Sequence, residues 1–164
     1  MKRRKGFVSN SSSSSFILSI PRKPKDKEDL FNFMFFDGDT EYVDPYEDKS
    51  YPMEDVVSAV MSQLVDQKPM TKDEMVYLVN CGHIDHPFLD NLELFKDADG
   101  NYQWEEREKL QKEIAEDVVK DFSRVHKNKE FYNVSFSDNE GDLNGAIEHG
   151  SAFDRIPHLR CSFH

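Results

Sequence analysis

The segments of this chain that have the pattern of β-strands lie near its two ends, and the helix-like segments lie between them. Near the N-terminus, residues 16–20 are rich in β-forming side chains and are stopped by Pro21 and Pro24. Near the C-terminus, residues 131–136 form a second strand-like run, and residues 159–163 alternate apolar and polar side chains. This distribution predicts a small sheet whose strands come from both ends of the chain.

Three segments between these strands have the apolar periodicity of amphipathic helices. Residues 53–66 carry apolar side chains at helical spacing along one face, and residues 105–127 carry an apolar stripe opposite a charged face. A shorter segment, residues 72–79, follows Thr71, which together with Glu74 has the form of a capping box. The pattern therefore predicts a helix in each of the three segments.

These elements predict one α+β domain over residues 16–164, with a small, mostly antiparallel sheet packed by three or four helices. A short fourth helix is predicted within residues 25–36, whereas residues 92–104 fit either a hairpin or a loop between helices. Residues 1–15 form a basic, Ser-rich segment before the domain. Their composition is that of a flexible linker, and the alternative is an ordered loop that leads into the first strand.

The chain is acidic overall, and its charge is unevenly distributed. Among 164 residues, 32 Asp and Glu face 21 Lys and Arg, for a formal net charge of −11. The part through Lys27 carries +7, which leaves −18 on the remainder. Because an acidic surface repels phosphate backbones, we expect no direct nucleic-acid binding by the body of the protein. No apolar run is long enough for an export signal or a membrane span, so we expect a cytosolic protein without membrane contact.

The two ends of the chain resemble a known group of sequences. Residues 5–18, KGFVSNSSSSSFIL, are similar to the start of small, poorly characterised proteins of bacteriophages and bacteria that open with Phe-Val-Ser-Asn-poly-Ser-Phe. The closing EHGSAFDRIPHLRCSFH resembles the usual ending of the same group. The resemblance covers residues 5–18 and about 133–164, and it implies a phage-type or bacterial protein of the bacterial or host cytosol. It implies no activity.

Polar residues from both ends form the first candidate site. His158, Arg160, Ser162 and His164 share one face of the expected last strand, and their donors suit an anion such as phosphate or a carboxylate. If the Ser-rich segment lies beside this strand, its hydroxyl and backbone N–H groups complete an anion site. The alternative is a terminal strand with a solvated polar face. The candidate ligand-binding residues are Ser11, Ser13, Ser15, His149, His158 and Arg160.

Cysteine and histidine residues suggest a second kind of site. Cys81, His83 and His86 lie close together in the sequence, as do Cys161 and His164. Thiolate and imidazole groups are the ligands of tetrahedral zinc sites, but Cys161 and His164 point to opposite faces of a regular strand. We therefore predict no cofactor, with buried thiols and surface histidines, and keep zinc as the alternative.

An acidic block within residues 37–48 suggests a partner-binding surface, and its members are Asp37, Asp39, Glu41, Asp44, Glu47 and Asp48. Such a block can dock a basic protein, including a nucleic-acid-binding protein whose phosphate path it imitates, or can be an ordinary solubilising loop. The leading hypothesis is a non-enzymatic accessory protein that binds a protein partner. The rival is a small enzyme or ligand-binding domain, with or without a metal, whose site lies between the Ser-rich segment and the last strand.

Overall fold

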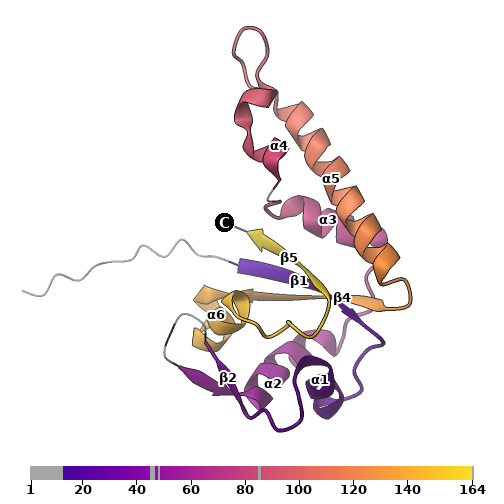
Figure 1. The fold of residues 1–164 in the computed structure, drawn as a ribbon, viewed down its shortest axis with the longest axis vertical. Helices are drawn as coiled ribbons and strands as arrows, with labels where there is room; N and C mark the ends of the chain where they lie inside the picture. The colour runs from indigo at the N-terminus through magenta and orange to yellow at the C-terminus, as the bar shows by residue number, and fades with distance from the viewer. Residues whose placement is uncertain (1–12, 45–46, 48, 85, 164) are drawn as a thin grey trace, which may run out of the picture.

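Strand β1 (Ser13–Ile20) is the centre of the fold, because it pairs on both edges with strands from the C-terminal part of the chain. The computed structural model describes residues 13–44, 47, 49–84 and 86–163. In it, β1 lies antiparallel between β4 (Glu130–Ser137) and β5 (His158–Phe163), so the strand order is β4-β1-β5 (Figure 1). The antiparallel sheet predicted from both ends of the chain is confirmed.

One face of the sheet is covered by three helices: α1 (Lys27–Met34), α2 (Met53–Leu64) and α6 (Asp142–His149). Because successive strand residues point to opposite faces, Phe16 and Leu18 of β1 both face this layer. Their side chains are buried with apolar residues of the helices and of β4. Each fully buried aliphatic or aromatic side chain of this kind contributes about 1.5–3 kcal/mol to folding.

The opposite face carries a second, smaller core under α3 (Lys72–Cys81) and α5 (Trp104–Val125). Ile17 of β1 is buried in this core together with apolar residues of both helices. The capping box predicted at the start of α3 is confirmed, because Thr71 accepts from the backbone of Glu74 and the Glu74 side chain accepts from the backbone of Thr71. The sheet is thus enclosed between two helical layers (Figure 1).

The outer edge of β4 is covered by side chains of the α2 region rather than by another strand. The Gln63 amide donates to the Ser135 carbonyl and accepts from the Ser135 N–H, both at 2.8 Å. One helical turn later, Gln67 Nε2 donates to the Asn133 carbonyl at 2.6 Å. These two glutamines satisfy backbone groups that would otherwise offer a pairing edge to another chain.

A helical projection extends beyond the sheet and is formed by α4 (Pro87–Asp90), η1 (Leu92–Phe95) and the start of α5 (Figure 1). We refer to residues 86–108 as the arm. At its end, an isolated bridge between Lys96 and Tyr102 closes a turn, so the segment predicted as either a hairpin or a loop has features of both.

Asp97 organises this turn by accepting hydrogen bonds from the backbone N–H groups of Asp99 and Asn101, each at 2.9 Å. These hydrogen bonds lower the pKa of the Asp97 carboxyl group. The tip of the arm is therefore held by local polar contacts rather than by a core.

A short hairpin of β2 (Glu41–Val43) and β3 (Ser50–Pro52) begins within the acidic block at residues 37–48 and ends just after it. Its Tyr42 is buried, and the phenol donates to the Ala146 carbonyl at 2.9 Å. Burial raises the pKa of Tyr42 to about 12. A Cβ atom at Gly150 would lie 1.7 Å from the Tyr42 hydroxyl, so only glycine permits this contact.

The predicted helices are present, and α1 lies within the segment expected for a short helix. One boundary differs from the prediction. The domain was expected to begin at residue 16, but its first strand, β1, begins at Ser13. A short η2 turn (Asp138–Glu140) joins β4 to α6. Across the residues described here, none of the helices has the length and apolarity needed to cross a membrane.

Candidate functional site

A fully buried carboxyl group lies where α6 meets the sheet. Glu148, in the last turn of α6, has 0% of its surface exposed. Its Oε1 accepts a hydrogen bond from Ser14 Oγ at 3.2 Å, and its Oε2 accepts one from the Asp138 backbone N–H at 3.1 Å. A carboxyl group is costly to bury unless such partners satisfy its oxygens, so the position of Glu148 depends on β1 and η2.

Arg160 and His149 extend these contacts into what we call the Glu148 cluster: Ser14, Asp138, Glu148, His149 and Arg160. Arg160 donates to Ser14 Oγ from Nε at 3.2 Å and from Nη2 at 3.1 Å. His149 Nε2 lies 3.7 Å from Glu148 Oε2. Arg160 and His149, which were predicted to bind an external anion, thus lie around a carboxyl group of the chain itself.

The register of β1 decides which serine belongs to this cluster. Ser14 is paired with Ser162, and its side chain lies on the same face as that of Arg160. The side chains of Ser13 and Ser15 lie on the opposite face, where Ser15 Oγ is 2.6 Å from Ser135 Oγ. Ser14 was not among the candidate residues. Its hydroxyl nevertheless makes the contact with Arg160 that was expected for the hydroxyl groups of Ser13 and Ser15. Ser11 lies outside the described residues.

His158 lies on the same strand face as Arg160 but has other contacts. Its ring packs edge-on against Phe16 and Phe153, with ring centroids 5.8 and 6.1 Å away. Its Nδ1 lies 2.8 Å from the Ile156 carbonyl oxygen. Of the three residues proposed for the anion site on the C-terminal side, His149 and Arg160 reach the Glu148 cluster, whereas His158 packs on aromatic rings.

Parts of the acidic block at residues 37–48 are engaged in local structure. Asp44 is only 9% exposed, and its Oδ1 accepts from the Glu47 N–H at 3.2 Å. The Glu47 carboxylate pairs with Lys49 at 2.7 Å, and Asp39 accepts from the Phe36 N–H. The outward-facing members are Asp37, Asp39, Glu41 and Glu47, while Asp48 lies outside the described residues.

The candidate zinc ligands are placed as follows. Cys161 is buried as predicted, and burial raises the pKa of its thiol to about 11. The prediction of a buried thiol is wrong for Cys81, which is exposed at the end of α3. The His86 ring accepts from the Phe88 N–H and so caps α4. Within the part of the chain that the structure describes, which leaves out His164, no group of three or more His, Cys, Asp and Glu residues is suited to a metal ion.

His83, the remaining candidate ligand, has a structural role through its backbone. Its N–H donates to the Ser162 carbonyl at 2.7 Å, which adds one bridging residue to the outer edge of β5. This contact joins the end of α3 to the end of the sheet.

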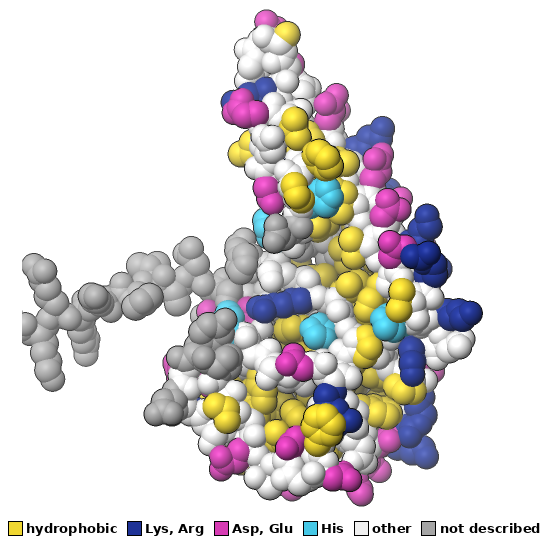
Figure 2. Space-filling view, in the orientation of Figure 1, with side chains coloured by type: hydrophobic (Ala, Val, Ile, Leu, Met, Phe, Trp, Pro, Cys, Tyr) yellow, Lys and Arg dark blue, Asp and Glu magenta, His cyan; other side chains and the backbone are white. Residues whose placement is uncertain are grey.

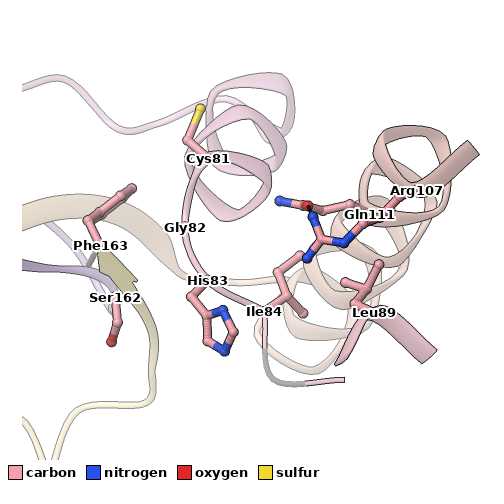
Figure 3. Close-up of a pocket in the computed structure, with 9 residues that line it drawn as sticks. All are labelled: Cys81, Gly82, His83, Ile84, Leu89, Arg107, Gln111, Ser162 and Phe163. Carbon is pink, nitrogen blue, oxygen red and sulfur yellow. Dashed lines mark hydrogen bonds between the residues drawn. The ribbon is translucent and has the colours of Figure 1, made fainter. Parts of the chain in front are cut away.

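A pocket of about 310 Å³ lies where the arm, the end of α3 and the end of β5 meet. Figure 3 shows Arg107 and Gln111 of α5 together on one side, with Ser162 and Phe163 of β5 across from them. The His83 ring points away from Arg107. Neither Arg107 nor Gln111 stands out in the sequence, because their positions within a charged helix are typical of solvated residues.

The arm also exposes large apolar side chains. Phe88, Leu92, Leu94 and Trp104 are each more than half exposed, with fractions of 59%, 52%, 55% and 62%. Figure 2 shows hydrophobic side chains gathered over the arm among acidic ones. Residues 86–108 contain seven acidic and two basic residues, a net charge of −5. Exposed apolar side chains surrounded by polar ones are a feature of protein-binding sites.

Comparisons with known proteins assign this chain to no family. No protein-family model matches it, and neither the curated proteins nor the solved structures contain a significant match.

Proposed function

We propose that this chain is a non-enzymatic accessory protein of phage or bacterial type, acting in the cytosol by binding a basic protein partner. The observation that carries the proposal is the arm, which presents exposed apolar side chains within a strongly acidic segment. The acidic block at residues 37–48 is a second surface that a basic partner can contact.

The apolar residues of the arm have the features of binding anchors. Trp104 packs against Tyr102 with ring centroids 4.2 Å apart and ring planes tilted by 56°, so the indole is in contact with the arm before any partner arrives. A pre-positioned aromatic side chain loses little conformational entropy on binding, and tryptophan is among the residues most enriched at interface hot spots. On the inner side of the arm, Leu89 and Phe95 are buried and support the exposed residues.

The charge around these anchors selects the class of partner. Asp90 lies on α4 with Phe88, and Glu93 lies on η1 with Leu94. Glu105 and Glu106 follow Trp104 in the first turn of α5. An acidic rim accelerates and orients the approach of a basic surface and repels nucleic acid. We therefore assign the partner as a basic protein, which includes a nucleic-acid-binding protein whose phosphate-binding path the acidic surface occupies.

The test combines Leu94→Ser with Trp104→Ser and compares this arm variant with Tyr77→Ser, which alters a residue 71% exposed on α3. Tagged wild-type and variant proteins are used to isolate partners from a bacterial lysate, and the affinity for each purified partner is then measured at two salt concentrations. We expect a basic partner whose Kd rises at least tenfold with the arm variant, stays unchanged with Tyr77→Ser, and rises with salt.

Two results would contradict the proposal. One is the absence of any specific partner. The other is a partner that binds the wild type and the arm variant equally and is insensitive to Asp37→Asn combined with Glu41→Gln, because binding would then use neither acidic surface.

A further inference from the structure

The three-stranded sheet has two outer edges, β4 and β5, and they differ in how their backbone groups are covered (Figure 1). At β4, the side-chain amides of Gln63 and Gln67 bond to backbone groups of the outer edge. At β5, the described residues supply one such contact, in which the His83 N–H donates to the Ser162 carbonyl at 2.7 Å. The rest of the β5 edge is therefore open to pairing with another strand.

The His83 contact also shows which backbone groups of β5 point outward. Residues along an antiparallel strand alternate between bonding to one neighbour and bonding to the other. Since the Ser162 carbonyl points away from β1, the N–H and C=O groups of Arg160 and His158 point the same way. In the part of the chain that the structure describes, no hydrogen bond is made to these groups. They are the donors and acceptors with which an added strand pairs.

An apolar pocket of about 300 Å³ lies beside this open edge, on the side of α3 and α5. Its wall includes Leu159 of β5, Val118 of α5 and Ile84, which follows α3; each is half-buried and so in part accessible. Successive side chains of a strand point to opposite faces of the sheet. A strand paired with β5 therefore directs alternate side chains toward this pocket, which can select among them.

The opposite face of the same edge carries a positive charge. Arg160 is exposed, and its Nε and Nη2 donate to the Ser14 hydroxyl rather than to a carboxylate. The Glu148 carboxyl group of the same cluster is fully buried and accepts from Ser14 and from the Asp138 N–H. Opposite charges directly across two paired strands are favourable, and like charges are unfavourable. An acidic residue therefore suits the position opposite Arg160, and a basic one does not.

We propose that the outer edge of β5 binds an extended peptide segment of another protein, with an acidic residue opposite Arg160 and an aliphatic residue on each side of it. The peptide backbone pairs with Arg160 and His158, and an aliphatic side chain enters the pocket beside Leu159, Val118 and Ile84. A second copy of this chain fits less well, because pairing two β5 edges about their centres sets Arg160 against its own copy. The site uses none of the exposed arm residues and does not rest on the proposed basic partner.

The test titrates the ¹⁵N-labelled full chain with acetyl-Thr-Thr-Val-Glu-Val-Thr-Thr-amide, whose sequence is the same in both directions and so suits either strand orientation. In the free chain, we expect the outward amides of Arg160 and His158 to exchange with solvent faster than those of Leu159 and Cys161, which bond to β1. Saturating peptide should slow exchange at Arg160 at least tenfold and leave Cys161 unchanged.

Two altered peptides separate backbone pairing from charge. Methylation of the glutamate nitrogen removes the N–H that pairs with the Arg160 carbonyl, and it should weaken binding at least tenfold. Lysine in place of glutamate should weaken binding at least threefold. Arg160→Gln should abolish the preference for glutamate over lysine, whereas Arg124→Gln, which removes a surface arginine from α5, should retain it.

Circular dichroism checks that both variants are folded, and the two altered peptides test the wild-type chain independently of any variant. The proposal is overturned if the wild type shows no saturable change at the Arg160 and His158 amides, if the methylated peptide binds as tightly as its parent, or if lysine is preferred to glutamate. It is also overturned if the free chain is a dimer whose Arg160 amide is already protected, because a second copy then covers the edge. Loss of the basic partner by the arm variant affects none of these readouts.

Discussion

At the scale of single residues, Glu148 is the buried charge-bearing group on which the arrangement of β1, η2 and α6 depends. Its two oxygens accept hydrogen bonds from the Ser14 hydroxyl and the Asp138 N–H. Removing the carboxyl group takes away the acceptor of both of these hydrogen bonds at a position that is 0% exposed. The cost of such unsatisfied groups exceeds the value of the hydrogen bonds themselves.

We therefore expect Glu148→Ala to lower the free energy of unfolding by about 2–4 kcal/mol, the scale for removing one partner of a buried polar network. Urea denaturation measures this change, and Glu140→Ala, at an exposed position of η2, is the control and should alter stability by less than about 0.5 kcal/mol. Equal losses in the two variants would show that the hydrogen bonds to Glu148 contribute no net stability.

The burial of Glu148 could not be predicted from the sequence. A glutamate near the end of a short polar helix is expected to be solvated, and its burial follows only from the position of Ser14 after the sheet has formed. Serine-rich composition likewise predicts a linker, yet Ser13, Ser14 and Ser15 belong to the central strand. Pairing with β4 and β5 on both sides overrides the weak strand propensity of serine.

At the scale of elements, α2 and α3 were predictable because each has a strong local signal. Helix α2 follows its apolar periodicity, and α3 begins at the capping box formed by Thr71 and Glu74. The arm has no comparable signal, since α4 and η1 are short and their apolar residues are divided between an inner face and an exposed one. Only the structure separates these two faces, because it shows that Leu89 and Phe95 are buried on the inner side of the arm.

The glutamines beside β4 give a prediction at this scale. Gln63→Ala removes both side-chain hydrogen bonds to the Ser135 backbone and opens that part of the strand edge. Water replaces these bonds in part, so we expect a loss of about 1 kcal/mol in unfolding free energy together with faster hydrogen exchange at the Ser135 amide.

Ser58→Ala on the same helix is the matched control, because the Ser58 hydroxyl donates to the Glu54 carbonyl within α2. It should leave exchange at Ser135 unchanged. If Gln63→Ala also leaves that exchange rate unchanged, the edge of β4 is protected by something other than the glutamine amide.

At the scale of the whole molecule, we expect the net charge of −11 to act on folding and on the proposed partner binding in opposite directions. Like charges on one compact body repel each other, and salt screens this repulsion within a Debye length of about 10 Å at 0.1 M. The attraction between the acidic arm and a basic partner is screened by the same ions. Added salt should thus favour the folded chain and disfavour the complex.

We expect the free energy of unfolding to rise between low salt and about 0.2 M NaCl by on the order of 1 kcal/mol or less, the scale of surface charge interactions. Over the same range, the Kd for the basic partner should increase. Urea denaturation and calorimetric titration in matched buffers measure the two quantities, and repeating both with Glu105→Gln combined with Glu106→Gln should reduce both salt dependences, because less charge remains to be screened. If unfolding and binding respond to salt with the same sign, the charge of this chain does not act through simple screening, and the basic-partner proposal loses its electrostatic support.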